Sequence, residues 1–122
     1  MPLPLEGYRI LDLSLWQQGT YATAMLADMG ADVIKIESVS NLDPGRGVGF
    51  GGDLNAYFHS LNRGKRSVVM DLKSEAGLEV FFKLVEQADV FPNNLRGGAL
   101  GRLGITYERL AEVNPTIIMS SA

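Results

Sequence analysis

Short apolar runs alternate with segments of helical periodicity along this chain, and that alternation limits its possible folds more than any other feature. Residues 8–13 and 32–37 are apolar runs of the kind that form buried strands. Between them, four apolar residues have the i, i+3, i+4, i+7 spacing of one helical stripe: Ala22, Met25, Leu26 and Met29. Thr20 is the expected N-cap of this helix and Gly30 its expected stop. Two strands joined by a helix form a crossover unit, so these strands should pair in parallel.

The same alternation continues to the last residues. Further strands are expected over residues 66–72, 89–91 and 116–120, and helices after the N-cap residues Asp53, Ser74 and Thr106, with a short helical turn over 97–103. The apolar stripes of the first two of these helices are Leu54, Tyr57, Phe58 and Leu61, and Leu78, Phe81, Phe82 and Val85. This pattern predicts one α/β domain over residues 1–122, with a doubly wound, mostly parallel, Rossmann-like sheet. No closing helix follows the last strand, so we expect the domain to be part of a larger fold.

The segment 38–52 has no periodicity and predicts a long loop. It contains a literal GxGxxG at residues 47–52. The dinucleotide-binding motif of that form joins a strand directly to its helix, whereas here the preceding strand is expected to end roughly ten residues earlier. We therefore interpret it as a glycine-rich loop beside a site.

Composition excludes several classes of function. The net charge of −3 argues against a general nucleic-acid binder, which needs clustered positive charge. The chain has no cysteine, so disulfides and thiolate metal sites are excluded, and no histidine or carboxylate cluster has metal-ligand spacing. The N-terminal residues do not resemble a signal peptide, and no run approaches the ~18 apolar residues of a membrane span. We expect a cytoplasmic protein without a metal.

Ligands of open parallel sheets bind beyond the carboxyl ends of the strands, and two polar segments follow expected strands there. Gln17 and Gln18 precede a helix, whose free N–H groups favour an anionic or carbonyl ligand. Asn94, Arg96 and Arg102 surround a glycine-rich helix start, which would suit a diphosphate. A polar turn without a ligand is the alternative for the first segment.

A burst of positive charge is the third candidate. Four cationic residues lie within eleven positions: Arg63, Lys65, Arg66 and Lys73. Arginine forks and lysine point charges together suit a ligand with several phosphates. A solvated basic turn is the alternative. The single histidine, His59, and Trp16 are expected to pack rather than to react.

The chain also resembles a known family. The strings PLEGYRILDLS, YATAMLADMGADVIKIE, NRGKRSVVMDLK and ADVFPNNLRGG are similar to the amino-terminal region of the class III, CaiB/BaiF-type CoA transferases. The match runs over residues 4–121, and its most specific pieces are GADVIKIE, at residues 30–37, and NRxKRSVxxDLK, at residues 62–73.

This resemblance implies the coenzyme A-binding part of an enzyme that moves CoA between carboxylic acids, with an acyl-CoA and a small carboxylic acid as substrates. Full-length members form interlocked homodimers. By resemblance, Gln17 orients the thioester, and the coenzyme contacts Gln17, Gln18, Met70, Lys73, Asn94, Leu95 and Arg102. The nucleophilic aspartate, which forms an anhydride and then an enzyme-bound thioester, lies beyond residue 122 in the family, so the chain alone should be inactive.

The chain departs from the family pattern in places that leave alternatives open. Ser38 stands where an arginine is usual, residues 18–20 replace an AGP turn, and residues 94–98 replace NFRPG. A racemase of 2-methylacyl-CoA thioesters, from the same family, is one alternative, although Gln17 favours a transferase. A non-catalytic CoA-binding or scaffolding subunit is another, and a nucleotide-binding domain unrelated to CoA is a third.

Overall fold

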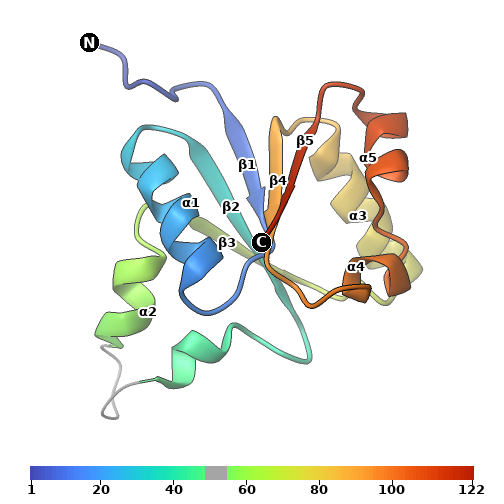
Figure 1. Ribbon diagram of the computed structural model, residues 1–122, viewed down its shortest axis with the longest axis horizontal. Coiled ribbons are helices and arrows are strands. Elements are labelled where there is room, and N and C mark those ends of the chain that lie inside the picture. Colours follow the sequence, from blue (N-terminus) through green and yellow to red (C-terminus); the bar gives the residue numbers. More distant parts are fainter. Residues whose placement is uncertain (49–54) are drawn as a thin grey trace.

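The sheet is five-stranded, and every strand pair in it is parallel (Figure 1). The structure, a computed structural model, describes residues 1–48 and 55–122. The strands are β1 (Arg9–Asp12), β2 (Asp32–Ser38), β3 (Arg66–Met70), β4 (Val90–Asn93) and β5 (Ile118–Ser121). Their order in the sheet is β3-β2-β1-β4-β5, which is the order of a doubly wound, Rossmann-type sheet. The predicted fold class is therefore confirmed.

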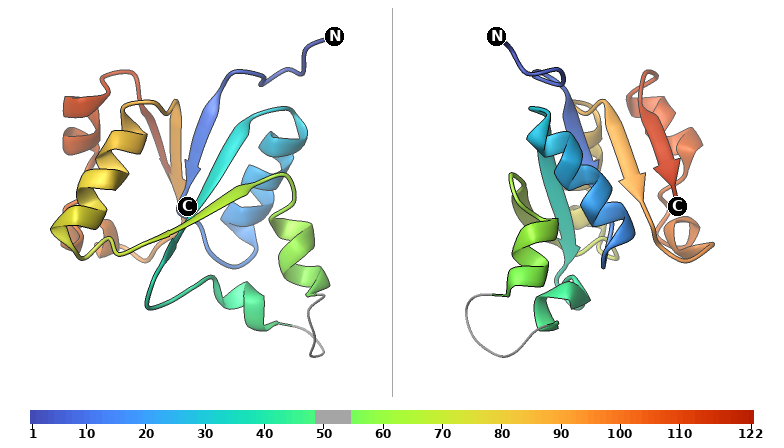
Figure 2. Two further views of the ribbon diagram at one scale, coloured as in Figure 1. Left: turned by 180° about the vertical axis from the view of Figure 1, so that it is seen from behind. Right: turned by 60° about the vertical axis from the view of Figure 1, so that its left-hand side comes forward.

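Helices cover both faces of the sheet (Figures 1 and 2). One layer contains α1 (Gln18–Asp28) and α2 (Ala56–Leu61), and the other contains α3 (Glu75–Val85), α4 (Ala99–Arg102) and α5 (Tyr107–Val113). The chain crosses to the other face after β3, where α3 begins, and β4 then pairs with β1, so the winding reverses between these two strands. In sheets of this kind, ligands bind at the carboxyl ends of the strands where the winding reverses.

The main core lies between the sheet and the layer that contains α3 and α5. Phe81 and Phe91 are fully buried, with their rings edge to face at 5.4 Å, and Phe82 stacks on Phe81 in the same way. The stripe predicted for α3 is confirmed, since Phe81 and Val85 are buried and Leu78 and Phe82 pack against the same core. Edge-to-face aromatic pairs add stability beyond the burial of their area.

Helix α1 differs from its prediction in both its start and its buried face. It begins at Gln18, and Thr20 is not its N-cap but a fully buried residue of the first turn. The sheet-facing side is formed by Thr20, Thr23 and Ala24, whereas Met25 and Met29 of the expected stripe are 38% and 45% exposed. The apolar pattern failed here because both threonine hydroxyls have buried partners: that of Thr23 donates to the carboxylate of Asp12, and that of Thr20 donates to the backbone carbonyl of Trp16.

The N-caps of the other helices largely follow the sequence. Ser74 and Thr106 accept hydrogen bonds from the backbone N–H groups three residues later, as predicted. Asn55 caps α2; the predicted cap Asp53, Leu54 of the predicted stripe and most of the GxGxxG segment lie outside the described residues. A 3₁₀ turn, Pro44–Gly47, interrupts the expected loop and is capped by Asp43.

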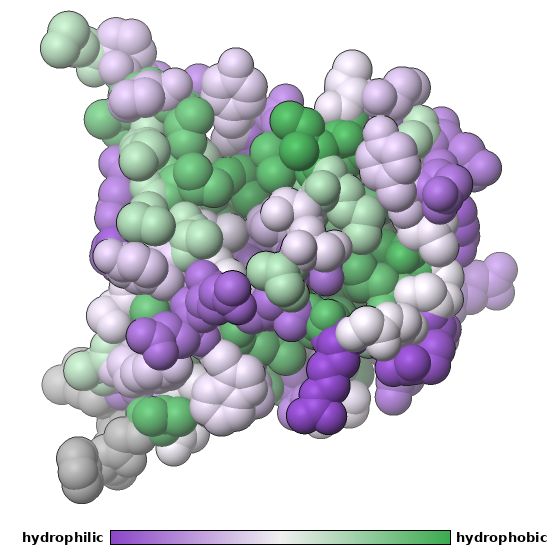
Figure 3. Space-filling view, in the orientation of Figure 1, coloured by the Kyte–Doolittle hydropathy of each residue, from purple (hydrophilic) through white to green (hydrophobic). Residues whose placement is uncertain are grey.

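Apolar side chains are also exposed on the outer surface. Figure 3 shows them gathered near the centre of one face of the molecule. Ile118 of the edge strand β5 is 62% exposed, and Tyr21 on the outer side of α1 is 48% exposed. Within the described residues, none of the helices has both the length and the apolar character needed to cross a bilayer.

Candidate functional site

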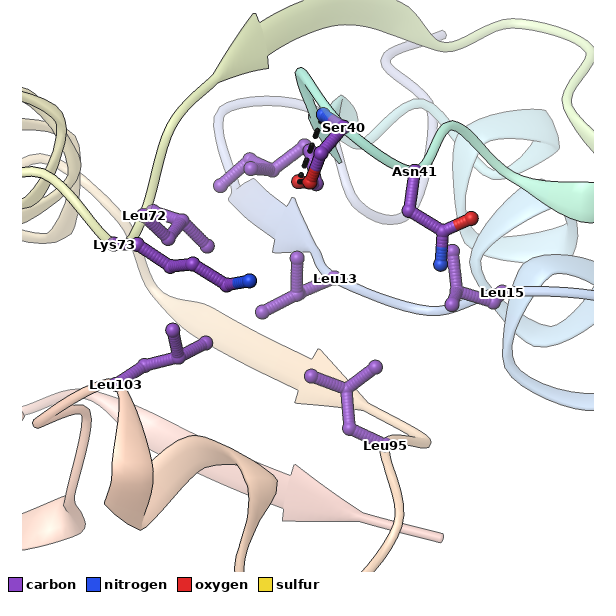
Figure 4. Close-up of a pocket in the computed structure, with 10 residues that line it drawn as sticks. Leu13, Leu15, Ser40, Asn41, Leu72, Lys73, Leu95 and Leu103 are labelled. Atoms are coloured by element: carbon purple, nitrogen blue, oxygen red, sulfur yellow. Dashed lines mark hydrogen bonds between the residues drawn. The ribbon is translucent and has the colours of Figure 1, made fainter.

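A pocket of about 220 Å³ opens where the carboxyl ends of β1, β2 and β3 and the segment after β4 converge (Figure 4). Its lining is mostly apolar: Leu13, Leu15, Ile36, Ser38, Ser40, Asn41, Leu72, Lys73, Leu95 and Leu103. Lys73 is the one charged residue of this lining, and its side chain extends across the pocket toward Leu13. An apolar pocket with a few polar groups is the usual form of a small-molecule site.

A second hollow, of about 430 Å³, shares Leu15 and Leu95 with this pocket. Its other lining residues are Trp16, Asn94, Arg96, Ala99 and Arg102. Because the two hollows share walls, they form one surface with a lysine in one part and two arginines in the other. That surface can accept an extended ligand that has both apolar and anionic parts.

The turn that follows β1 forms the wall between these hollows. The Asn94 side chain holds Leu15 from both sides, since its Nδ2 donates to the Leu15 carbonyl at 2.7 Å and its Oδ1 accepts from the Leu15 amide at 2.8 Å. Trp16 has φ = 63°, and it is the single non-glycine residue with positive φ in the described part of the chain. Such a conformation is costly and is characteristic of functional sites.

The structure brings together four of the seven residues expected to contact a ligand. Lys73 and Leu95 line the pocket, and Asn94, Leu95 and Arg102 line the hollow beside it. Gln17 and Gln18 are exposed at the start of α1, next to Trp16. The remaining residue, Met70, is 7% exposed and packs in the hydrophobic core.

Three of the four cations of the basic burst pair with carboxylates of the chain itself. Lys65 is buried, with Nζ 2.9 Å from Asp12 Oδ2. Burial lowers its pKa, although the charge of Asp12 and its hydrogen bond oppose that shift. Arg63 pairs with Asp28 and Arg66 with Asp32, both on the surface. Of the four cations, Lys73 is the one that lines the pocket.

Sequence reasoning missed a buried polar cluster beneath the turn. Lys35, Glu37 and Asp43 are each 1% exposed. Lys35 Nζ lies 2.8 Å from Asp43 Oδ2, and Glu37 pairs with Arg46. A signal was present, because Lys35 and Glu37 interrupt an otherwise apolar strand. Charges in a strand buried on both faces need partners in the interior.

Glu37 remains ionised within this cluster. Burial by itself raises the pKa of Glu37. The hydrogen bonds from Arg46 and from the Asp43 amide, together with the charges of Arg46 and Lys35, lower it by more, so the net shift of the pKa is downward. Arg46 also stacks on Phe58 of α2, with its guanidinium carbon 4.0 Å from the ring centre. These contacts fix the segment after β2 against the rest of the sheet.

Comparison with known proteins agrees with this architecture. The chain is 41% identical to the acetyl-CoA:oxalate CoA-transferase of Acetobacter aceti, over 98% of the chain and 31% of that enzyme. It is 42% identical to the succinate–glutarate CoA-transferase of Agrobacterium fabrum, over 97% of the chain and 32% of the enzyme. The chain thus spans about a third of the length of these relatives.

A solved structure supports the same grouping. The crystal structure of a CaiB/BaiF family protein from Brucella suis superimposes with a TM-score of 0.89 and 38% identity, covering 99% of this chain and 33% of that one. The family model described as CoA-transferase family III matches residues 5–122. This chain belongs to CoA-transferase family III.

Proposed function

We propose that this chain forms the coenzyme A-binding part of an acyl-CoA transferase active site. The observation that carries the proposal is the continuous surface formed by the pocket and the hollow beside it. Leucine side chains line its middle, Lys73 lies in one part, and Arg96 and Arg102 lie in the other. Coenzyme A supplies both kinds of group, since its nucleotide carries a 3′-phosphate and a 5′-diphosphate for the cations and its long pantetheine arm, which carries the thioester, can lie along the leucines.

Within this proposal, Lys73 and Arg102 hold phosphate groups, and Leu95 contacts the pantetheine arm. Gln17 is exposed at the entrance of α1; there its amide can orient the thioester carbonyl. Asn94 acts indirectly, because both of its polar groups already bond to Leu15. The Met70 side chain contributes to the core, so a contact of Met70 with the coenzyme would have to involve its backbone.

The reaction we propose for the whole protein is the transfer of CoA between two carboxylic acids. The relatives named above are transferases, which favours transfer over racemisation of the acyl group. The nucleophilic aspartate, an acyl-CoA and a small carboxylic acid as substrates, and the interlocked homodimer remain predictions from the family resemblance. The part of the site formed by residues 1–122 binds and orients the coenzyme.

Titration calorimetry with CoA tests the binding proposal. The double variant Lys73→Ala/Arg102→Ala should bind CoA about 100-fold more weakly, since a hydrogen bond to a charged group contributes about 1.5 kcal/mol or more. Lys83→Ala is the matched control, because Lys83 is an exposed lysine that pairs with Glu79 on α3. It should leave the affinity unchanged.

Pantetheine, which lacks the nucleotide phosphates, separates the two halves of the proposal. It should bind the wild type and the double variant equally, because the double variant removes phosphate contacts alone. Equal CoA affinity in the wild type and the double variant would contradict the assignment of Lys73 and Arg102. Absence of CoA binding by the wild-type chain would contradict the proposal that this part binds the coenzyme by itself.

A further inference from the structure

In the segment Ser14–Trp16, the backbone N–H and C=O groups of all three residues form hydrogen bonds with side chains. The Ser14 amide donates to Asp12 Oδ1 at 3.0 Å, and its carbonyl accepts from Lys35 Nζ at 2.8 Å. Both backbone groups of Leu15 bond to Asn94. The Trp16 amide donates to Asp43 Oδ1 at 3.1 Å, and its carbonyl accepts from the Thr20 hydroxyl.

These bonding side chains come from several parts of the sequence. Asp12 ends β1, Lys35 lies in β2, Thr20 in the first turn of α1, and Asn94 follows β4. All of them are buried or half-buried. Buried backbone groups must be paired, and here side chains provide the partners that a helix or a sheet would otherwise supply. The turn is thus held by a frame that forms only when the whole sheet is assembled.

Asp43 is the member of this frame that acts on Trp16 directly. Its Oδ1 accepts from the amides of both Trp16 and Gly45. Its Oδ2 makes no hydrogen bond within the described residues and is balanced by Lys35, 2.8 Å away. Lys35 in turn holds the Ser14 carbonyl. A tryptophan keeps a left-handed backbone conformation only where the surrounding contacts hold it there. Asp43 and Lys35 supply such contacts, to the Trp16 amide and to the Ser14 carbonyl.

We propose that Asp43, supported by Lys35, is a positioning residue that holds Trp16 in its left-handed conformation and so fixes the wall of the ligand site. The Trp16 side chain is 51% exposed and lines the hollow with Arg96 and Arg102. Gln17 follows directly and occupies the N-cap position of α1, where its side chain makes no capping hydrogen bond. The inference rests on the proposed function only for the identity of the ligand, since the frame itself is a property of the free protein.

Two double variants isolate the hydrogen bond to Trp16 from the buried charge. Lys35→Met/Asp43→Leu removes both charges and the acceptor, whereas Lys35→Met/Asp43→Asn removes both charges and keeps an acceptor oxygen. Neither leaves an unpaired buried charge, so both should fold. Asn114→Ala is the stability control. Asn114 is buried and bonds to the carbonyls of Val85 and Ala88, before the start of β5 and away from the pocket.

Trp16 is the only tryptophan of the chain, so tryptophan fluorescence, excited where tyrosine does not absorb, reports on this turn alone. In the leucine variant without ligand, we expect lower Trp16 anisotropy and stronger quenching by acrylamide. Asn114→Ala should match the wild type even where its melting temperature falls. The asparagine variant keeps the acceptor for the Trp16 amide but loses Lys35, so it should stay closer to the wild type than the leucine variant does. A merely structural role for Asp43 would lower stability without separating the two double variants.

Coenzyme A affinity provides the second measurement. A turn that adopts the held conformation one-tenth of the time weakens binding about tenfold, and we expect this loss in the leucine variant but not in the asparagine variant. Unchanged Trp16 mobility in the leucine variant, or equal CoA affinity in the two double variants, would overturn the inference. If the wild type binds no CoA, the ligand-free fluorescence still decides the inference, and the proposed function alone fails.

Discussion

Replacing Gly77 by alanine should destabilise the protein strongly, because the third residue of α3 lies against the turn that carries Lys73. A Cβ at this position would lie 1.9 Å from the Asp71 carbonyl oxygen and 2.7 Å from its carbon. These atoms are backbone and cannot move aside alone. The first turn of α3 would therefore have to separate from the segment that precedes it.

The cost follows from the hydrogen bonds at this junction. The Asp71 carbonyl accepts from the Ser74 amide at 3.1 Å and from the Ser74 hydroxyl at 2.9 Å, and that hydroxyl accepts from the Gly77 amide at 3.0 Å. Losing three bonds at about 1 kcal/mol each costs about 3 kcal/mol. Alanine in a helix regains about 1 kcal/mol relative to glycine. The expected net loss is about 2 kcal/mol.

Urea unfolding followed by circular dichroism measures this loss. Gly101→Ala is the matched control, because Gly101 also lies in a helix, α4, but a Cβ there would meet no atom within 4 Å. That variant should be neutral or stabilised by up to about 1 kcal/mol. Because Lys73 precedes Ser74, Gly77→Ala should also weaken CoA binding. Equal unfolding midpoints for the two variants would refute the steric reasoning.

Further predictions concern the core, the turn and the response to acid. Phe91→Ala should lower the free energy of unfolding by about 3–5 kcal/mol, measured by urea titration, since Phe91 is fully buried. Asn94→Ala should cost about 1–3 kcal/mol by the same assay, and should raise acrylamide quenching of the neighbouring tryptophan, because it frees both backbone groups of Leu15. The pKa of Glu37 in the folded protein is lower than its ordinary value of 4.5. The stability that the ionised carboxylate contributes is therefore fully present above pH 4.5 and is lost as the pH falls through the folded-state pKa. The difference in unfolding midpoint between the wild type and Glu37→Gln should therefore shrink below pH 4.5.

The architecture was predictable because the apolar runs are local and strong. The apolar runs over residues 8–13 and 32–37 predicted the first parallel strand pair, since buried parallel strands are nearly continuous in apolar residues, and the α3 stripe predicted part of the main core. The face of α1 was not predictable in the same way. Its inner residues are polar because each has a buried acceptor that the apolar pattern does not reveal: Thr23 donates to the Asp12 carboxylate, and Thr20 donates to the Trp16 carbonyl.

The candidate site was predictable in its position but not in its supports. The strand-end rule predicted Lys73 and Arg102 at the carboxyl edge of the sheet, and in the structure each of them lines a hollow. Composition could not separate Lys65, which is buried against Asp12, from Lys73, which is exposed. That distinction depends on whether each side chain points into the protein or toward solvent, which cannot be read from the positions of charges along the sequence.

The junction between β1 and β4 has a consequence for folding order. Ile10 of β1 pairs with Val90 of β4, which lies far away in the sequence, whereas β2 pairs with β1 and β3, which lie much closer to it in the sequence. Closing so long a loop is entropically costly, so contacts of this kind form late in folding. The bonds between Asn94 and Leu15 cross the same junction. We therefore expect the β1–α1–β2–β3 half to gain structure first and the surface proposed to bind coenzyme A to appear only in the last step, so that binding competence would report complete folding.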